Sequence, residues 1–142
     1  MEVCVCFCYN KKRITIQKYQ NSNTIKTREG KNMETMQGKK NIVLIGMPGA
    51  GKSTVGVVLA KRLGYRFLDS DLVIQEQTKK LLHELITEHG VDGFLKIEED
   101  INSGLDCEQA VIATGGSVIY GEKAMEHLRK IGCVVYLSLI HI

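Results

Sequence analysis

The chain has 142 residues, of which 44% are hydrophobic and 25% charged, a composition typical of a globular domain and unlike that of a disordered or fibrous chain. No apolar run approaches the ~20 residues of a membrane span, so we expect no membrane partner. The net charge of +3 divides into +6 for residues 1–40 and −3 for residues 41–142, and the mildly acidic larger part gives no support for nucleic-acid binding.

The first 38 residues differ in character from the rest. Val3-Cys4-Val5-Cys6-Phe7-Cys8 alternates like a strand, but a polar run rich in Lys, Asn, Gln and Thr follows it. One-residue gaps between cysteines do not match common metal-ligand spacings, and five cysteines without a C-x-x-C pair argue against a disulfide framework. We therefore expect residues 1–38 to be disordered or a spurious extension before a start at Met33 or Met36. Residues 39–137 would then form one domain, in a reducing cytoplasm.

A glycine-rich stretch, Gly46-Met47-Pro48-Gly49-Ala50-Gly51-Lys52-Ser53, fits the pattern G-x-x-x-x-G-K-[ST] of a phosphate-binding P-loop. The apolar run 41–45 before it predicts a buried parallel strand. Residues 54–64 after it predict a helix with Val55, Val58 and Leu59 on one face and Gly64 at its end. Strand, loop and helix in this order are the context that the motif requires, so we predict a phosphate site here.

The residue types of the loop suit a nucleotide with Mg²⁺. Its three glycines let the backbone approach a phosphate closely, and successive N–H groups then point at the β-phosphate from the start of a helix. We predict that Lys52 reaches the β- and γ-oxygens and that the Ser53 hydroxyl is a ligand of Mg²⁺. The predicted cofactor-binding residues are Gly46, Met47, Pro48, Gly49, Ala50, Gly51, Lys52, Ser53 and Thr54.

A second predicted strand, residues 65–71, ends in Asp69-Ser70-Asp71, and a helix follows with Asp71 at or near its N-cap. Phosphoryl transfer needs a carboxylate near Mg²⁺ and a group that orients or deprotonates the acceptor hydroxyl. Two carboxylates spaced i, i+2 at one strand end are able to divide these tasks between them. Beside a P-loop, we interpret Asp69 and Asp71 as site residues.

The remaining elements alternate between helix and strand. The pattern predicts helices over 72–78, 81–90, 94–105 and 122–131 and strands over 110–114 and 133–137. This alternation indicates an α/β fold with a parallel sheet covered on both faces, whose ligands bind at the carboxyl ends of the strands. Gly115-Gly116-Ser117 lies at that edge, where bare glycine backbone favours the close approach of a substrate.

Taken together, these motifs resemble those of the shikimate kinase family. The resemblance covers residues 40–137 and rests, in order, on the P-loop, Phe67-Leu68-Asp69-Ser70-Asp71, Phe94-Leu95-Lys96-Ile97-Glu98-Glu99 and Thr114-Gly115-Gly116-Ser117-Val118. It implies a three-layer P-loop NTPase fold of the nucleoside-monophosphate-kinase type, with ATP and Mg²⁺ as cofactors. By matching position it implies that Lys52 holds phosphates, that Ser53 and Asp69 serve the metal, and that Asp71 holds the acceptor hydroxyl and acts as base. Gly115, Gly116 and Ser117 would line the substrate.

The chain departs from the family pattern in two places. The family motif is Phe-Arg-x-x-Glu, whose arginine holds the shikimate carboxylate; here that position is Leu95, while Glu98, the usual partner of the arginine, remains. Lys96 lies about 100° further round the helix and does not replace the arginine. The family also continues beyond position 137 into a lid, a fifth strand and a last helix, which we expect this chain to lack, with residues 138–142 as an artefactual tail.

Three functions stay open from the sequence. The first is ATP-dependent phosphorylation of shikimate to shikimate 3-phosphate, in aromatic amino acid biosynthesis. The second, favoured by Leu95, is a kinase of another small hydroxylated metabolite, such as a gluconate-type kinase. The third, favoured by the missing lid, is a nucleotide-binding fragment without transferase activity. In each case we expect a cytoplasmic monomer.

Overall fold

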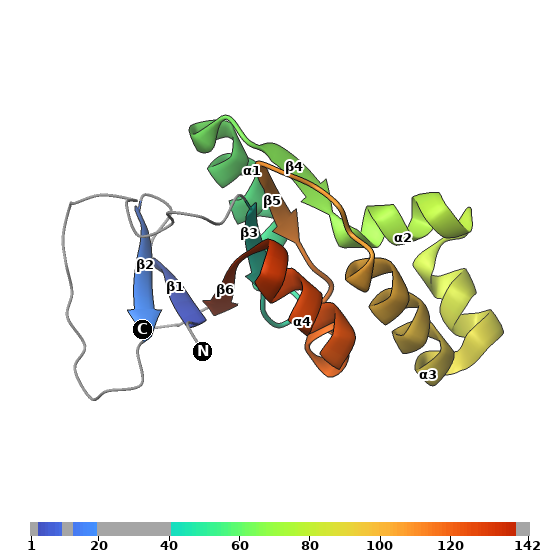
Figure 1. Cartoon of the computed structure of the whole chain (residues 1–142). Helices are drawn as coiled ribbons and strands as arrows, with labels where there is room; N and C mark the ends of the chain where they lie inside the picture. The colour runs from blue at the N-terminus through green and yellow to red at the C-terminus, as the bar shows by residue number, and fades with distance from the viewer. Residues whose placement is uncertain (1–2, 10–12, 20–40, 139–142) are drawn as a thin grey trace.

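A computed structural model of the chain describes residues 3–9, 13–19 and 41–138. The elements in chain order are β1 (Val3–Tyr9), β2 (Arg13–Tyr19), β3 (Asn41–Ile45), α1 (Lys52–Leu63), β4 (Arg66–Asp69), α2 (Ser70–Thr78), α3 (Leu82–Ser103), β5 (Ala110–Ala113), the 3-10 helix η2 (Val118–Tyr120), α4 (Glu122–Ile131) and β6 (Gly132–Ser138) (Figure 1). No helix within the described ranges is long and apolar enough to cross a bilayer.

One sheet with the strand order β2-β1-β6-β3-β5-β4 organises the fold. The four strands from β6 to β4 are parallel, with Val43 of β3 opposite Ile112 of β5 and Val134 of β6. Because β3, β5 and β4 are adjacent and parallel, the loops that follow them leave the sheet side by side at one edge. The predicted α/β fold with a parallel sheet is confirmed.

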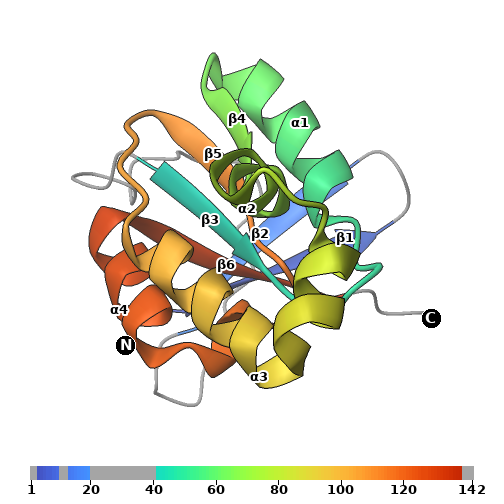
Figure 2. The ribbon, with the colours of Figure 1, turned by 90° about the vertical axis from the view of Figure 1, so that its right-hand side faces the viewer.

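Alternate residues of β3 belong to two different hydrophobic cores, one on each face of the sheet. Val43 and Ile45 pack with residues of α4, whereas Ile42 and Leu44 pack with residues of α1. Figure 2 shows α1 and α4 on opposite sides of the sheet. A strand buried on both faces needs apolar residues at every position, which is why residues 42–45 form a continuous apolar run.

Helix α1 begins and ends close to the predicted positions, with Gly64 as its C-cap. The predicted apolar face is partly wrong, because Val58 is exposed, whereas Gly56 and Ala60 are buried. A Cβ on Gly56 would lie 2.6 Å from the ring of Phe67 in β4, so the helix approaches the sheet through its small residues. In α1 the position of the bulky apolar residues therefore did not predict which face packs against the sheet.

The two helices predicted over 81–90 and 94–105 form the single kinked helix α3. The kink lies at Gly90, whose backbone dihedrals (φ 71°, ψ 176°) are not helical and suit glycine. A third hydrophobic cluster, centred on Ile74, Leu85 and Phe94, joins α3 to α2.

Part of the N-terminal segment differs from the expectation of disorder for residues 1–38. β1 pairs in parallel with β6, and β2 pairs antiparallel with β1. A strand at a sheet edge presents unpaired N–H and C=O groups, and the alternating pattern of residues 3–8 suits pairing with such an edge. The other residues of 1–38, and residues 139–142 of the expected tail, lie outside the described residues.

Asn41, the first residue of β3, is buried and connects three separate segments. Its Nδ2 donates to the carbonyl oxygens of Cys107 (2.7 Å) and Ile131 (2.9 Å), and its Oδ1 accepts from the N–H of Ala110 (3.0 Å). We expect Asn41→Ala to lower the free energy of unfolding by about 3 kcal/mol, because it leaves buried backbone groups without partners. Denaturant titration monitored by circular dichroism measures this loss.

Ser103→Ala is the control for that measurement, since within the described part of the chain the Ser103 hydroxyl bonds only inside its own helix, to the carbonyl of Asp100. It should change stability by less than about 0.5 kcal/mol. Equal stability of Asn41→Ala and the native protein would show that these three hydrogen bonds do not contribute to the fold.

Candidate functional site

The glycine-rich loop lies between β3 and α1, as the sequence predicts. Gly49 and Gly51 have φ values of 79° and 83°, a left-handed conformation that glycine adopts without strain, and Gly51 is the N-cap of α1. Gly46 lies against the carbonyl group of Leu137 in β6, where no Cβ would fit. The backbone N–H groups of the loop therefore lie at the N-terminus of a helix, an arrangement that favours an anion.

A pocket of about 360 Å³ opens beside this loop. It is lined by Pro48, Gly49, Gly51, Lys52, Ser53, Thr54, Asp71, Thr114, Gly115 and Gly116. Three of the predicted nucleotide-binding residues do not line it: Gly46 and Met47 accept hydrogen bonds from Lys52 through their carbonyl oxygens, and Ala50 is buried in the core beneath α1. These three residues would contribute to a phosphate site by fixing the conformation of the loop.

Lys52 is almost fully buried, with 8% of its surface exposed. Its ammonium group donates hydrogen bonds to the carbonyl oxygens of Gly46 (2.7 Å) and Met47 (2.8 Å). Burial lowers the pKa of Lys52, while the negative charges of Asp71 and Asp69 act to raise it. An ammonium group held in this way supplies a positive charge at the edge of the pocket.

Asp69 connects the loop to the second strand. Its Oδ2 accepts a hydrogen bond from the Ser53 hydroxyl (3.0 Å), and its Oδ1 accepts from the N–H of Asp71 (3.0 Å). The N-cap of α2 is therefore Asp69, and Asp71, expected at or near the N-cap, lies two residues further on in the first turn of the helix. Because one oxygen of Asp69 caps the helix, the orientation of its carboxylate is fixed. The side chain of Asp71 is not used as a helix cap.

The donor set fits Mg²⁺ better than a transition metal. Ser53 and Asp69 offer hard oxygen atoms 3.0 Å apart, and within the described residues no three His, Cys, Asp or Glu side chains gather into a metal-binding group. Mg²⁺ is usually held by one or two carboxylates together with waters and substrate phosphates, so it does not need such a group. Ser53 and Asp69 are the residues that would hold it.

Asp71 is half-buried and lines the pocket beside the P-loop. Burial raises the pKa of Asp71, and the neighbouring charge of Asp69 raises it further, whereas Lys52 lowers it. A carboxyl group with a raised pKa is a better proton acceptor than an ordinary aspartate. Its position allows contact with a molecule bound in the pocket beside the P-loop.

Gly115 and Gly116 follow β5 and complete the pocket. A Cβ on Gly115 would lie 2.6 Å from Glu98 Oε1 and 3.0 Å from Asp71 Oδ1, and a Cβ on Gly116 would lie 2.7 Å from the ring of Pro48. Glycine is therefore needed at these two positions because any side chain would collide with Glu98, Asp71 or Pro48. Gly115 also donates from its N–H to the hydroxyl of Ser70 (3.3 Å), a buried residue that the sequence analysis did not single out.

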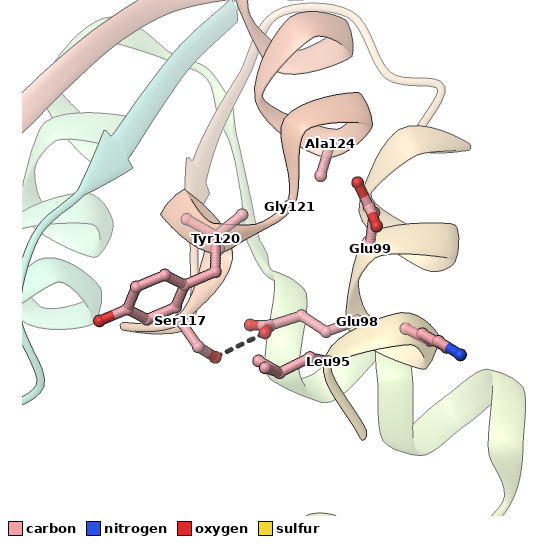
Figure 3. A pocket seen from close by; sticks show the side chains of 9 residues that line it. Leu95, Glu98, Glu99, Ser117, Tyr120, Gly121 and Ala124 are labelled. Carbon is pink, nitrogen blue, oxygen red and sulfur yellow. Dashed lines mark hydrogen bonds between the residues drawn. The ribbon is translucent and has the colours of Figure 1, made fainter. Parts of the chain in front are cut away.

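Ser117 does not line the nucleotide-side pocket but a second, smaller one of about 80 Å³ between α3 and η2. Figure 3 shows Glu98 of α3 pointing toward Ser117 and Glu99 pointing toward Ala124, whereas the ring of Tyr120 points away from α3. The Ser117 hydroxyl donates to Glu98 Oε2 at 2.5 Å. Leu95, where the resembling family has an arginine, gives the pocket an apolar wall.

Comparison with known proteins gives a consistent result. A family model described as "Shikimate kinase" matches residues 48–140. The chain is 42% identical over 100 residues to a shikimate kinase of a Nostoc species, covering 70% of this chain and 55% of that one. It is 43% identical over 101 residues to a shikimate kinase of Clostridium botulinum, covering 70% of this chain and 61% of that one.

Solved structures agree with the sequence relatives. A shikimate kinase from Acinetobacter baumannii in complex with shikimate superposes with a TM-score of 0.68 at 38% identity, covering 72% of this chain and 58% of that one. The enzyme from Aquifex aeolicus gives a TM-score of 0.64 at 31% identity, covering 70% and 60%. The chain thus spans between about half and two thirds of the length of these relatives.

Proposed function

The chain belongs to the shikimate kinase family, and we propose that the protein transfers the γ-phosphoryl group of ATP to the 3-hydroxyl of shikimate. One observation carries the proposal: the P-loop with Lys52, the carboxylate of Asp71 and the glycines 115 and 116 line a single pocket. A phosphate cradle, a base and bare backbone in one cavity are the parts that phosphoryl transfer to a small hydroxyl compound needs.

The residues divide the work of the reaction as follows. The N–H groups of the loop and the Lys52 ammonium group hold the phosphates of ATP and offset the charge that develops during transfer. Ser53 and Asp69 would hold Mg²⁺, which would supply positive charge to the phosphate oxygens. Asp71 accepts a hydrogen bond from the acceptor hydroxyl and removes its proton. Gly115 and Gly116 let the acceptor approach the backbone.

Leu95 favours a second candidate acceptor. It lines the pocket between α3 and η2 from which the family's arginine would bind a carboxylate, and it offers no hydrogen bond there. An apolar side chain at this position suits an acceptor whose carboxylate is absent or differently placed, as in a kinase of another small hydroxylated metabolite. The phosphoryl-transfer chemistry is the same for both candidates, so only the acceptor separates them.

The test is an acceptor panel with purified protein, Mg²⁺ and ATP. We expect ADP release that depends on shikimate, with shikimate 3-phosphate identified by mass spectrometry. Gluconate and a neutral polyol serve as competitors at equal concentration. Turnover of a competitor with no turnover of shikimate would replace the first candidate by the second. The cytoplasmic location and the monomeric state stay predictions, checked by cell fractionation and light scattering.

Leu95→Arg is expected to raise kcat/KM for shikimate by about tenfold, because a guanidinium donates two parallel hydrogen bonds to a carboxylate. Glu98, one turn further along α3, is placed to orient the new side chain. The affinity for ATP should not change, since the P-loop belongs to the other pocket. Steady-state kinetics with shikimate and with the best alternative acceptor measure the effect.

Lys96→Arg is the matched control, since it introduces a guanidinium at the neighbouring position of the same pocket. It should leave kcat/KM within about twofold of the native value, because residue 96 points about 100° away from residue 95 around the helix. If the native protein already uses shikimate efficiently and Leu95→Arg adds nothing, then Leu95 does not determine the acceptor.

A further inference from the structure

Glu98 is an unusual carboxyl group in this chain. Only 2% of its surface is exposed, and its Oε1 has no hydrogen-bond partner among the described residues. The groups that face it are the hydroxyl of Ser117 from the loop after β5 and the carboxylate of Asp71 from α2. On its own helix the residue one turn earlier is Leu95, which carries no charge. No cation of the described part of the chain is paired with Glu98.

Burying an ionised carboxylate without a cation costs far more than burying the neutral acid. Burial raises the pKa of Glu98 and the charge of Asp71 raises it further, although the hydrogen bond from Ser117 acts in the opposite direction. Glu98 Oε1 is buried and has no hydrogen-bond partner among the described residues, which adds to the cost of a negative charge at this site. The surroundings of Glu98 therefore favour its neutral form.

The loop of residues 115–117 is held from two sides. On the α3 side, Glu98 bonds to Ser117 through one oxygen and packs against the Cα of Gly115 through the other. On the P-loop side, Gly116 packs against the ring of Pro48. Asp71 Oδ1 lies against the same face of Gly115 as Glu98 Oε1. The position of this loop relative to Asp71 thus depends on the contacts of Glu98 with Ser117 and Gly115, which connect the loop to α3.

We propose that Glu98 and Ser117 form a positioning pair for the acceptor: Glu98, as a neutral acid, fastens α3 to the loop of residues 115–117 and holds that loop beside Asp71. The inference rests on the proposed function, because it assigns the loop to the acceptor side of the reaction. Leu95 is part of the same arrangement. Without a cation at position 95, the Ser117 hydroxyl is the partner that keeps Glu98 in place.

The test compares Glu98→Gln, Glu98→Ala and Ser117→Ala in the intact protein. Glutamine is neutral and keeps the shape and the hydrogen bond to Ser117, so Glu98→Gln should retain the native KM for shikimate within about twofold. The two alanine variants should raise that KM by about tenfold, since a buried hydrogen bond is lost. All three should keep the native Kd for ATP. Asp100→Ala, which removes an exposed carboxylate from the same helix outside that pocket, should change neither value.

A second readout needs no acceptor. Amide hydrogen exchange of residues 115–117 should accelerate by about tenfold in Glu98→Ala and Ser117→Ala, and should stay at the native rate in Glu98→Gln. If Glu98→Gln is as impaired as Glu98→Ala in both readouts, Glu98 works as an anion and the proposal is overturned. Unchanged exchange in the alanine variants would overturn it as well. A native protein that phosphorylates no acceptor would contradict the proposed function, while the exchange rates would still decide the present proposal.

Discussion

Replacing Lys52 by alanine is expected to reduce kcat/KM for ATP by at least about 100-fold, the loss typical of removing one preorganised donor from a charged transition state. Among the described residues that line the pocket beside the P-loop, only Lys52 carries an ammonium group, and its hydrogen bonds to Gly46 and Met47 aim it along that loop. Without it, the phosphates lose their principal countercharge from the protein. Calorimetric titration with Mg-ATP and steady-state kinetics measure the two parts of the effect.

Lys61→Ala is the matched control, because Lys61 lies on the same helix, carries the same charge and is exposed. It should leave both ATP affinity and turnover within about twofold of the native values. Circular dichroism must show that the Lys52 variant is folded. An unchanged ATP affinity in that folded variant would remove the assignment of the loop as a phosphate site.

Asp71→Asn is expected to lower kcat by about 10²- to 10⁴-fold, the usual contribution of a general base. Asparagine keeps the size of the side chain but accepts no proton. Asp71 does not cap α2, because Asp69 does so, and the substitution should therefore leave the helix intact. The affinity for ATP should change little compared with kcat, since the phosphate-binding groups are untouched. Calorimetric titration with Mg-ATP measures the affinity, and steady-state kinetics with shikimate as acceptor measure kcat.

The control for Asp71 is Asp92→Asn, which removes an exposed carboxylate from α3. It should have no effect on kcat beyond about twofold. A native kcat in Asp71→Asn would mean that Asp71 only binds the acceptor, or that another group takes the proton. A fall in ATP affinity as large as the fall in kcat would instead place Asp71 on the nucleotide side of the pocket.

Most of the site was predictable because it is local in sequence. The P-loop is eight consecutive residues between a strand and a helix, and the structure has that order. Asp69, Asp71 and Gly115-Gly116 each follow a strand, and the rule that ligands bind at the carboxyl ends of parallel strands was enough to expect them at one edge. Their shared pocket agrees with that expectation for Asp71 and both glycines.

Other features depend on partners far apart in the chain. Ser117 bonds to Glu98 across 19 positions, and Asn41 bonds to Cys107 and Ile131 across 66 and 90. No periodicity or motif connects such residues, since only the folded backbone brings them together. The choice of Asp69 over Asp71 as the cap of α2 likewise depends on which carboxylate also meets Ser53.

The sequence by itself determined the alternation of strands and helices, the phosphate-binding loop and the residues placed at the ligand edge, because each follows from local spacing and residue type. The tertiary structure alone decided that α1 packs through Gly56 and Ala60, that β1 pairs with β6, and that Glu98 is buried with no cation paired to it among the described residues. The physical reason is that steric fit, edge pairing and desolvation are set by neighbours in space. Leu95 stood out in the sequence as a departure from the family motif, and the structure placed it beside Glu98 and Ser117 in one pocket.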